Sequence, residues 1–300
     1  MATTKNSTKA KTKKPVRKTS SKTTVKAAKT AKKSLSTKVT KPTAKKLTSA
    51  LLTKLNILSA VVSVALAAAA WSVMSSKSFE IVNGLLAKDE LASKTGDVLV
   101  PAVHHVYDVE LRLLVIIVLV ISAILPTLWL TVYKSRYAEA LKSKVNLLRW
   151  IDMAVISALM VEIVALVSGV QDIVVLKLLA GLMVVTCVLG WIAEKRNKQA
   201  GRPVWSELAV SIATGVLPWL LIATYAVSTW VHGGVHNSNY VYALYGVVFV
   251  GFVAYSMNLI NYVRRFGAWT KYEVVERNYL VVSIFTKVAF AAALIAGFQK

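Results

Sequence analysis

Long apolar stretches recur along most of the sequence, and they constrain the fold more than any other feature. A hydrocarbon core about 30 Å thick is crossed by about 20 helical residues. From Ser49 onward, seven stretches of that length are separated by short polar segments, at roughly 49–74, 111–133, 146–169, 173–193, 204–231, 239–262 and 277–297. We therefore predict an all-α membrane protein, a bundle of seven transmembrane helices.

Charge and hydrophobicity are separated along the chain. Hydrophobic residues make up 56% of the sequence and charged residues 17%, yet the formal net charge is +23. Residues 1–47 hold 16 of the 37 Lys and Arg and no acidic residue. Such a segment buries little apolar area and its like charges repel, so we expect a disordered Lys-rich cytoplasmic tail at 1–47 and a membrane domain at 48–300.

The tail is expected to lie against anionic lipid, where each Lys near the membrane surface contributes about 1 kcal/mol. Nucleic-acid binding is the alternative, because the composition is similar to that of linker-histone tails. That alternative is the weaker one, since no aromatic side chain is interleaved with the lysines to stack on bases.

Basic residues in the loops predict the orientation of the bundle. With a cytoplasmic tail, the inner loops contain 13 Lys and Arg, whereas the outer segments contain six. The first outer loop also holds six acidic residues: Glu80, Asp89, Glu90, Asp97, Asp108 and Glu110. We therefore predict a multi-pass protein with a cytoplasmic N-terminus and an extracellular C-terminus.

Lys287 lies about ten residues into the last predicted span. An ionisable side chain there costs about 2.5–3.5 kcal/mol on insertion scales, so it is a candidate functional residue. A buried lysine tends to lose its proton, and a neutral amine condenses with an aldehyde to form a Schiff base. Lys287 is thus a candidate attachment point for a carbonyl cofactor, and in a seven-helix bundle we expect retinal. A structural lysine paired with an acid is the alternative.

Asp152 is the candidate counterion of a protonated Schiff base. It lies about eight residues inside the third span, which enters from the same membrane face as the last, so both side chains lie roughly 12 Å deep. Arg149, one turn nearer the cytoplasm, is expected to keep the Asp152 carboxylate ionised, unless the two form an ordinary interfacial ion pair. Ser283, four residues before Lys287, can point its hydroxyl at the same site.

Several motifs resemble the heliorhodopsins, the retinal proteins of inverted topology. They occur in order between Leu55 and Gly297, whereas the tail is not covered: Arg149–Asp152, Ser157–Met160, Leu189–Lys195, Gly215–Trp219, Tyr240–Ala243, Asn258, Glu276–Tyr279, Ser283, Lys287 and Ala296–Gly297. The resemblance implies a bundle of rhodopsin type, a homodimer, and a small hairpin between the first two spans.

The resemblance also implies the composition of the site. Lys287 would bind all-trans retinal through the Schiff base, with Asp152 as its counterion and Ser283 hydrogen-bonding near it. Phe249 would lie beside the polyene, and we assign three further residues to the retinal site: Arg149, Met160 and Trp219. The chain departs from the family pattern in having Asp152 where Glu is usual, and Ser63 and Pro126 where the family has histidines.

The leading functional hypothesis is a light sensor without enzymatic activity, whose conformational signal is read by a partner that the sequence does not identify. One cysteine and the absence of Gly-rich phosphate loops argue against a Cys-rich metal site and a nucleotide enzyme. The alternative is a light-gated proton channel or transporter. Glu162 and Glu207 favour it, because acids inside spans often mark proton paths. A receptor without a chromophore leaves Lys287 unexplained.

Overall fold

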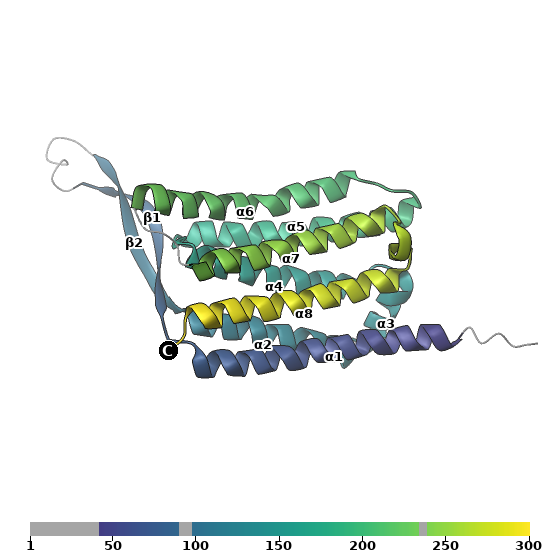
Figure 1. Cartoon of the computed structure of the whole chain (residues 1–300). Helices are drawn as coiled ribbons and strands as arrows, with labels where there is room; N and C mark the ends of the chain where they lie inside the picture. The colour runs from purple at the N-terminus through teal and green to yellow at the C-terminus, as the bar shows by residue number, and fades with distance from the viewer. Residues whose placement is uncertain (1–41, 90–97, 234–238) are drawn as a thin grey trace, which may run out of the picture. The chain divides into compact units, whose positions relative to one another are not determined.

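The computed structural model describes residues 42–89, 98–233 and 239–300. Seven helices in these ranges are long and apolar enough to cross a membrane, which confirms the predicted number of spans. They run alongside one another in Figure 1: α1 (Pro42–Val73), α2 (Leu111–Leu130), α4 (Leu147–Val167), α5 (Ile173–Ala200), α6 (Ser206–Gly233), α7 (Asn239–Val263) and α8 (Tyr272–Gly297).

The helix ends differ from the predicted boundaries mainly at the end of the bundle opposite the hairpin. The predicted tail lies outside the described residues up to residue 41, and α1 begins at Pro42, inside the range predicted for the tail. Proline is tolerated in the first turn of a helix, where its missing N–H would have no partner. α5 continues to Ala200 and α8 begins at Tyr272, so both extend beyond the apolar stretches that marked the spans.

Two short elements join the spans at this end, α3 (Lys134–Ser143) and η2 (Gly267–Thr270). The sequence analysis did not predict α3 as a helix, because its polar sequence lacks an apolar stretch. Its one buried residue, Tyr137, accepts a hydrogen bond from Asn56 Nδ2 of α1 at 3.1 Å. This contact holds α3 against the bundle.

A β-hairpin connects α1 to α2, as the family resemblance implied. Strands β1 (Ser78–Lys88) and β2 (Leu99–Glu110) are antiparallel, with a bulge between Ile81 and Val82. Asp172 fixes the hairpin to α5: its carboxylate accepts from the Gly84 amide at 3.0 Å and from two amides in the first turn of α5 at 2.8 and 3.0 Å. These hydrogen bonds lower the pKa of the Asp172 carboxyl.

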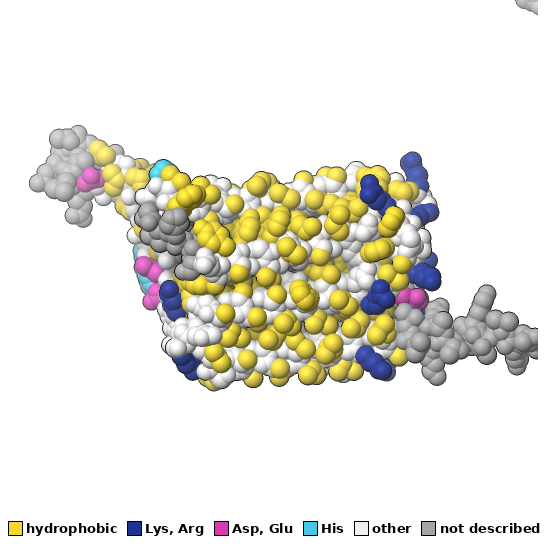
Figure 2. All heavy atoms as spheres, viewed as in Figure 1, with side chains coloured by type: hydrophobic (Ala, Val, Ile, Leu, Met, Phe, Trp, Pro, Cys, Tyr) yellow, Lys and Arg dark blue, Asp and Glu magenta, His cyan; other side chains and the backbone are white. Residues whose placement is uncertain are grey.

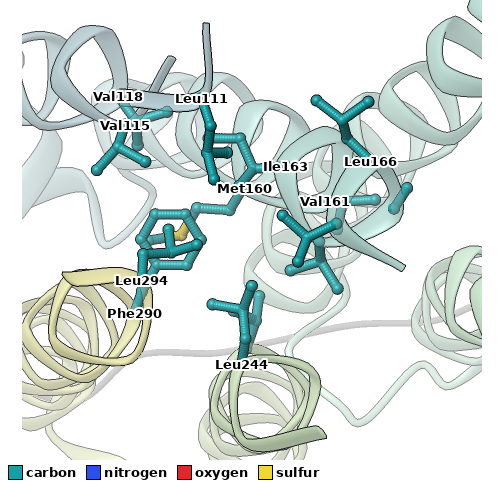
Figure 3. Packing of buried hydrophobic residues seen from close by; sticks show 14 of the residues in the cluster. Leu111, Val115, Val118, Met160, Val161, Ile163, Leu166, Leu244, Phe290 and Leu294 are labelled. Atoms are coloured by element: carbon teal, nitrogen blue, oxygen red, sulfur yellow. The ribbon is translucent and has the colours of Figure 1, made fainter. Parts of the chain in front are cut away.

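The helices close into a ring around one interior. α1 packs on α2 and on α8, α4 packs on α2 and α5, and α5 packs on α6, while α7 packs on α8. In the half nearer the hairpin the interior is filled by apolar side chains from α2, α4, α7 and α8, which Figure 3 shows meeting at one point: Leu111, Val115, Met160, Val161, Leu244, Phe290 and Leu294.

The surface of the described bundle matches a protein surrounded by lipid. Figure 2 shows hydrophobic side chains covering its length, with most Lys and Arg gathered at the end away from the hairpin. Large apolar residues such as Phe285, Val250 and Leu220 are more than half exposed. The protein is therefore an integral membrane protein, as its composition predicted.

Candidate functional site

A cavity lies inside the bundle. Residues from α4, α5, α6, α7 and α8 line it. Most of its wall is apolar or aromatic, including Ile156, Met160, Met183, Trp219 and Phe252. Its lining fits the usual ligand site, a concave apolar pocket with a few polar groups that fix orientation.

Lys287 projects into this cavity from α8. The residue is only 3% exposed, and Lys287 is the one buried lysine among the residues whose side chains the structure describes. Within the same part of the chain, its Nζ has no hydrogen-bond partner. A buried amine without a partner is costly, because desolvation is not compensated. The site is thus suited to an amine that becomes part of a covalent linkage.

Asp152 lines the same cavity from α4 and interacts electrostatically with Lys287. Its Oδ1 is buried and, among the described residues, also lacks a hydrogen-bond partner. One amine and one carboxylate thus face an apolar space, and neither is satisfied by the surrounding protein. This donor set fits a carbonyl cofactor that condenses with the amine, since the resulting cation would need the single negative charge of Asp152.

Hydroxyl and thiol groups surround this pair, and the sequence analysis found only one of them. Ser283 and Tyr255 both line the cavity, and their side chains interact. Ser157 lies 3.7 Å from the Cys187 sulfur, and its hydroxyl also donates to the Met153 carbonyl at 2.5 Å. Tyr255 and Cys187 were missed because a lone Tyr or Cys in an apolar helix carries no distinguishing pattern.

Trp219 forms one wall of the cavity, next to Pro218 of α6. It is buried, and its ring lies 6.1 Å from that of Phe252 and 5.4 Å from that of Phe249. Phe252 lines the cavity, whereas Phe249 is not part of the lining and packs behind Trp219. Phe249 lies one turn from Phe252 on the same side of α7, so its expected place beside the polyene stays a prediction.

Arg149 does not contact Asp152, which corrects the predicted pairing. Its guanidinium donates to Glu194 Oε1 at 2.7 Å and also contacts Glu276 Oε1. Helical side chains tilt toward the N-terminus of their helix, so Arg149 in the first turn of α4 points away from Asp152. The residue belongs to a separate polar cluster between the cavity and the end of the bundle opposite the hairpin.

This polar cluster is buried and extensively paired. Trp150 Nε1 donates to Glu194 Oε2 at 2.8 Å, and Asn146 Nδ2 donates to Glu276 Oε2 at 3.2 Å. Two of its neighbours, Trp150 and Tyr279, also line the cavity, and the Arg149 guanidinium lies 4.2 Å from the centre of the Tyr279 ring. The cluster therefore touches the cavity wall directly.

The sequence analysis gave Glu194 and Glu276 no role, although they are the acids at the centre of the cluster. Each stood one position outside a predicted span, at 193 and 277, whereas both lie within α5 and α8. Continuing the helical pattern by one turn past each apolar stretch would have brought both acids into the bundle. Both are almost completely buried.

Glu162 and Glu207, the two predicted proton-path residues, do not line the cavity. Glu162 accepts from Lys177 Nζ at 2.8 Å, on the hairpin side of the bundle. Glu207 lies in the first turn of α6, where it contacts Arg196 and accepts from the Ser206 hydroxyl at 2.7 Å. The two acids are thus paired locally, which removes the reason to join them in one path.

Two positions where the resemblance implied histidines are occupied by side chains that do not titrate. Ser63 is buried in α1, and Pro126 is buried inside α2. Neither side chain can accept and hold a proton near neutral pH as a histidine can.

Comparison with known proteins decides the family. A sequence model described as Heliorhodopsin matches residues 52–298. The chain belongs to the heliorhodopsin family. Heliorhodopsins are retinal-binding, light-responsive membrane proteins, and the buried Lys287 and the apolar cavity suit such a chromophore. A comparison with curated proteins finds no match.

A solved structure has a similar fold. It is the crystal structure of the transmembrane domain of Salpingoeca rosetta rhodopsin phosphodiesterase, similar with a TM-score of 0.57 and 11% sequence identity over 85% of this chain and 88% of that chain. At this identity the likeness shows the fold alone. It confirms the predicted bundle of rhodopsin type.

Proposed function

We propose that the protein is a light-sensing membrane photoreceptor in which Lys287 carries all-trans retinal through a Schiff base and Asp152 is the counterion. The observation that carries this proposal is the pair of unsatisfied groups, Lys287 Nζ and Asp152 Oδ1, in one apolar cavity. Retinal, when bound, supplies light absorption and isomerisation. The remaining chemistry belongs to the side chains of the cavity.

The cavity residues have distinct tasks in this proposal. Asp152 holds a negative charge opposite the lysine nitrogen, and Tyr255 and Ser283 supply two hydroxyls to the same cavity. Trp219 and Phe252 restrict the space along the apolar wall and exclude water. Exclusion of water strengthens the interaction between the two charges, because the effective dielectric constant falls.

The polar cluster around Arg149 provides a route from the cavity to the end of the bundle opposite the hairpin. Trp150 and Tyr279 line the cavity, and both contact members of the cluster. A displacement of either ring would therefore disturb the pairing of Arg149 with its two glutamates. A buried charge that loses its partner is strongly destabilised, so the Arg149 cluster would favour either its paired arrangement or a fully rearranged one. The cluster is therefore a suitable two-state element for a conformational signal.

A light-gated proton conductance is the second candidate function. It is favoured by the two buried acids Glu194 and Glu276, which stand between the cavity and one end of the bundle. If it operates, illumination under voltage clamp produces a current that Glu194→Gln abolishes and Glu162→Gln leaves unchanged. A complete absence of photocurrent over a range of pH and voltage leaves the sensor alone.

We further propose that the N-terminus is cytoplasmic, the C-terminus is extracellular and the protein is a homodimer. The orientation is supported by the excess of Lys and Arg in the loops opposite the hairpin, since positively charged loops stay inside. It also brings the Lys-rich tail to the anionic leaflet. A protease added outside intact cells would then cut the 75–108 segment and spare the tail.

Absorption spectroscopy tests the central pair. We expect the protein expressed with all-trans retinal to absorb visible light. Asp152→Asn removes the negative charge that stabilises the protonated Schiff base, so the Schiff base should lose its proton at neutral pH. Absorption should then move toward the near-ultraviolet, unless an anion such as chloride takes the place of the carboxylate. Glu162→Gln serves as the matched control, because that acid lies outside the cavity. An unchanged spectrum in Asp152→Asn without added anion would remove Asp152 from the counterion role.

A further inference from the structure

A second cavity lies at the end of the bundle opposite the hairpin, and it is strongly basic. It has a volume of about 780 Å³ and forms where the α3–α4 turn, the end of α5, the α5–α6 loop, the end of α7 and η2 meet. Its lining contains no acidic residue and four cations: Lys144, Lys198, Arg202 and Arg265. Figure 2 shows that Lys and Arg gather at this end.

The four cations of this basic cavity lack acidic partners in the described part of the chain. Arg265 donates to the Gly201 carbonyl, which ties the end of α7 to the end of α5 but leaves the charge uncompensated. Arg196, also on α5, is by contrast paired with Glu207. Cations that face one another across a concave surface raise the local potential, and a bound anion relieves their repulsion.

Two of the cations stand where the backbone favours glycine. Lys144 ends α3 with φ 57° and Arg265 follows α7 with φ 55°, and within the described ranges they are the two non-glycine residues with positive φ. Helices often end in this left-handed conformation, most commonly at glycine, because a Cβ is disfavoured there. A basic side chain near a helix C-terminus also interacts favourably with the helix dipole, and at both positions it is directed from a fixed cap into the basic cavity.

Besides the Arg265–Gly201 contact, hydrogen bonds that do not involve the cations fix the walls of the basic cavity. Asn197 donates to the Val204 carbonyl at 2.8 Å and accepts from the Val204 amide at 2.7 Å, which pins the loop that carries Arg202. Trp269 Nε1 donates to Asn258 Oδ1 at 2.7 Å, which pins η2 to α7. The cavity is therefore formed before any ligand arrives.

We propose that this basic cavity binds a phosphorylated anion, with Lys144, Lys198, Arg202 and Arg265 as its ligands. Arg and Lys are the side chains that recognise phosphate, and basic pockets between transmembrane helices bind phosphorylated headgroups. The site lies where the helices end, so a lipid headgroup in the membrane surface and a soluble phosphate ester both reach it. The proposal is independent of retinal binding.

Calorimetric titration of the full chain in neutral detergent tests the site and separates the two sources. One probe is short-chain phosphatidylinositol 4-phosphate, and the other is its soluble headgroup, inositol 1,4-bisphosphate. Equal affinity for both identifies a soluble phosphate ester as the ligand, whereas binding of the lipid alone identifies a membrane headgroup. Binding of neither probe overturns the proposal.

A pair of double variants locates the binding. Lys198→Gln with Arg202→Gln removes two cavity cations, and we expect affinity to fall by about 25-fold, about fivefold for each. Lys134→Gln with Lys195→Gln removes the same charge outside the cavity, and affinity should change by no more than about twofold. Equal loss in both variants shows that only net charge matters and overturns the site. If the first variant does not fold, the single substitution Lys144→Gln at an exposed side chain provides the same test, with an expected loss of affinity of about fivefold.

Discussion

The two halves of the bundle are held together in different ways. The half beside the hairpin is filled by apolar side chains, and residues such as Val161, Val164 and Leu294 are completely buried. The opposite half buries Arg149 with two glutamates and places Lys287 at its boundary. Because lipid is as apolar as leucine, close packing stabilises the first half, whereas the second depends on the pairing of Arg149 with Glu194 and Glu276. We therefore expect the apolar half to stay rigid, and the polar half to change its side-chain pairing when the retinal site changes.

Removal of Arg149 is expected to have the largest effect on this contrast. Arg149→Gln leaves Glu194 and Glu276 buried without a cation, which should cost about 3–5 kcal/mol of folding free energy. Thermal unfolding in a fixed detergent measures the loss. The matched variant is Lys177→Gln, which breaks the Lys177–Glu162 pair on the hairpin side, where the lysine is 65% exposed. It should cost about 1 kcal/mol or less, and equal losses would show that the two halves do not differ.

Gly190 on α5 tests how tightly the polar half is packed. A Cβ at this position would lie 2.5 Å from the Trp150 ring, which lines the cavity and bonds Glu194. Gly190→Ala should therefore cost about 1–3 kcal/mol by overpacking and shift the absorption maximum. Gly181 lies on the same helix with no atom within 4 Å of its Cβ position. Gly181→Ala should leave the spectrum unchanged, and a shift there as large as that of Gly190→Ala would refute the packing argument.

The hairpin provides the smallest effect and a pH dependence. Backbone hydrogen bonds lower the pKa of Asp172 below its ordinary value of 3.8. A carboxyl with a lowered folded-state pKa stabilises the fold near neutral pH, and this contribution is lost as pH falls through that pKa. The protection of β1 amides against hydrogen exchange, taken relative to the intrinsic exchange rate at each pH, should therefore fall below about pH 4. Asp172→Ala should show the lower protection already at neutral pH, at a cost of about 1 kcal/mol. Protection of β1 in the unmodified protein that does not change with pH would contradict this role.

Much of the fold could be predicted because apolar length is a local property of the sequence. Seven spans, their order and the shared depth of Lys287 and Asp152 follow from counting residues along helices. The polar loops, by contrast, carry no such signal, which is why α3 was missed. The helix ends were also misjudged, since hydropathy marks where a helix meets lipid and not where its hydrogen bonds stop.

The site was harder to predict because partners are a property of three-dimensional packing. Arg149 and Asp152 are three residues apart, yet the direction of the Arg149 side chain sends it to acids on α5 and α8. Phe249 and Phe252 lie on neighbouring turns of α7 and are similar in sequence context, yet only Phe252 lines the cavity. A single sequence does not report how each turn of a helix lies relative to a cavity.

Reductive trapping followed by peptide mapping tests most directly whether Lys287 carries the chromophore. Reduction converts the labile linkage to a stable amine, so the modified lysine can be read by mass spectrometry. We expect the retinal mass on the peptide that contains Lys287, and on no peptide of Lys287→Ala. Lys54, which lies in α1 with an exposed side chain, provides the internal control. Modification of Lys54 or another lysine, with Lys287 left unmodified, would contradict the proposed site.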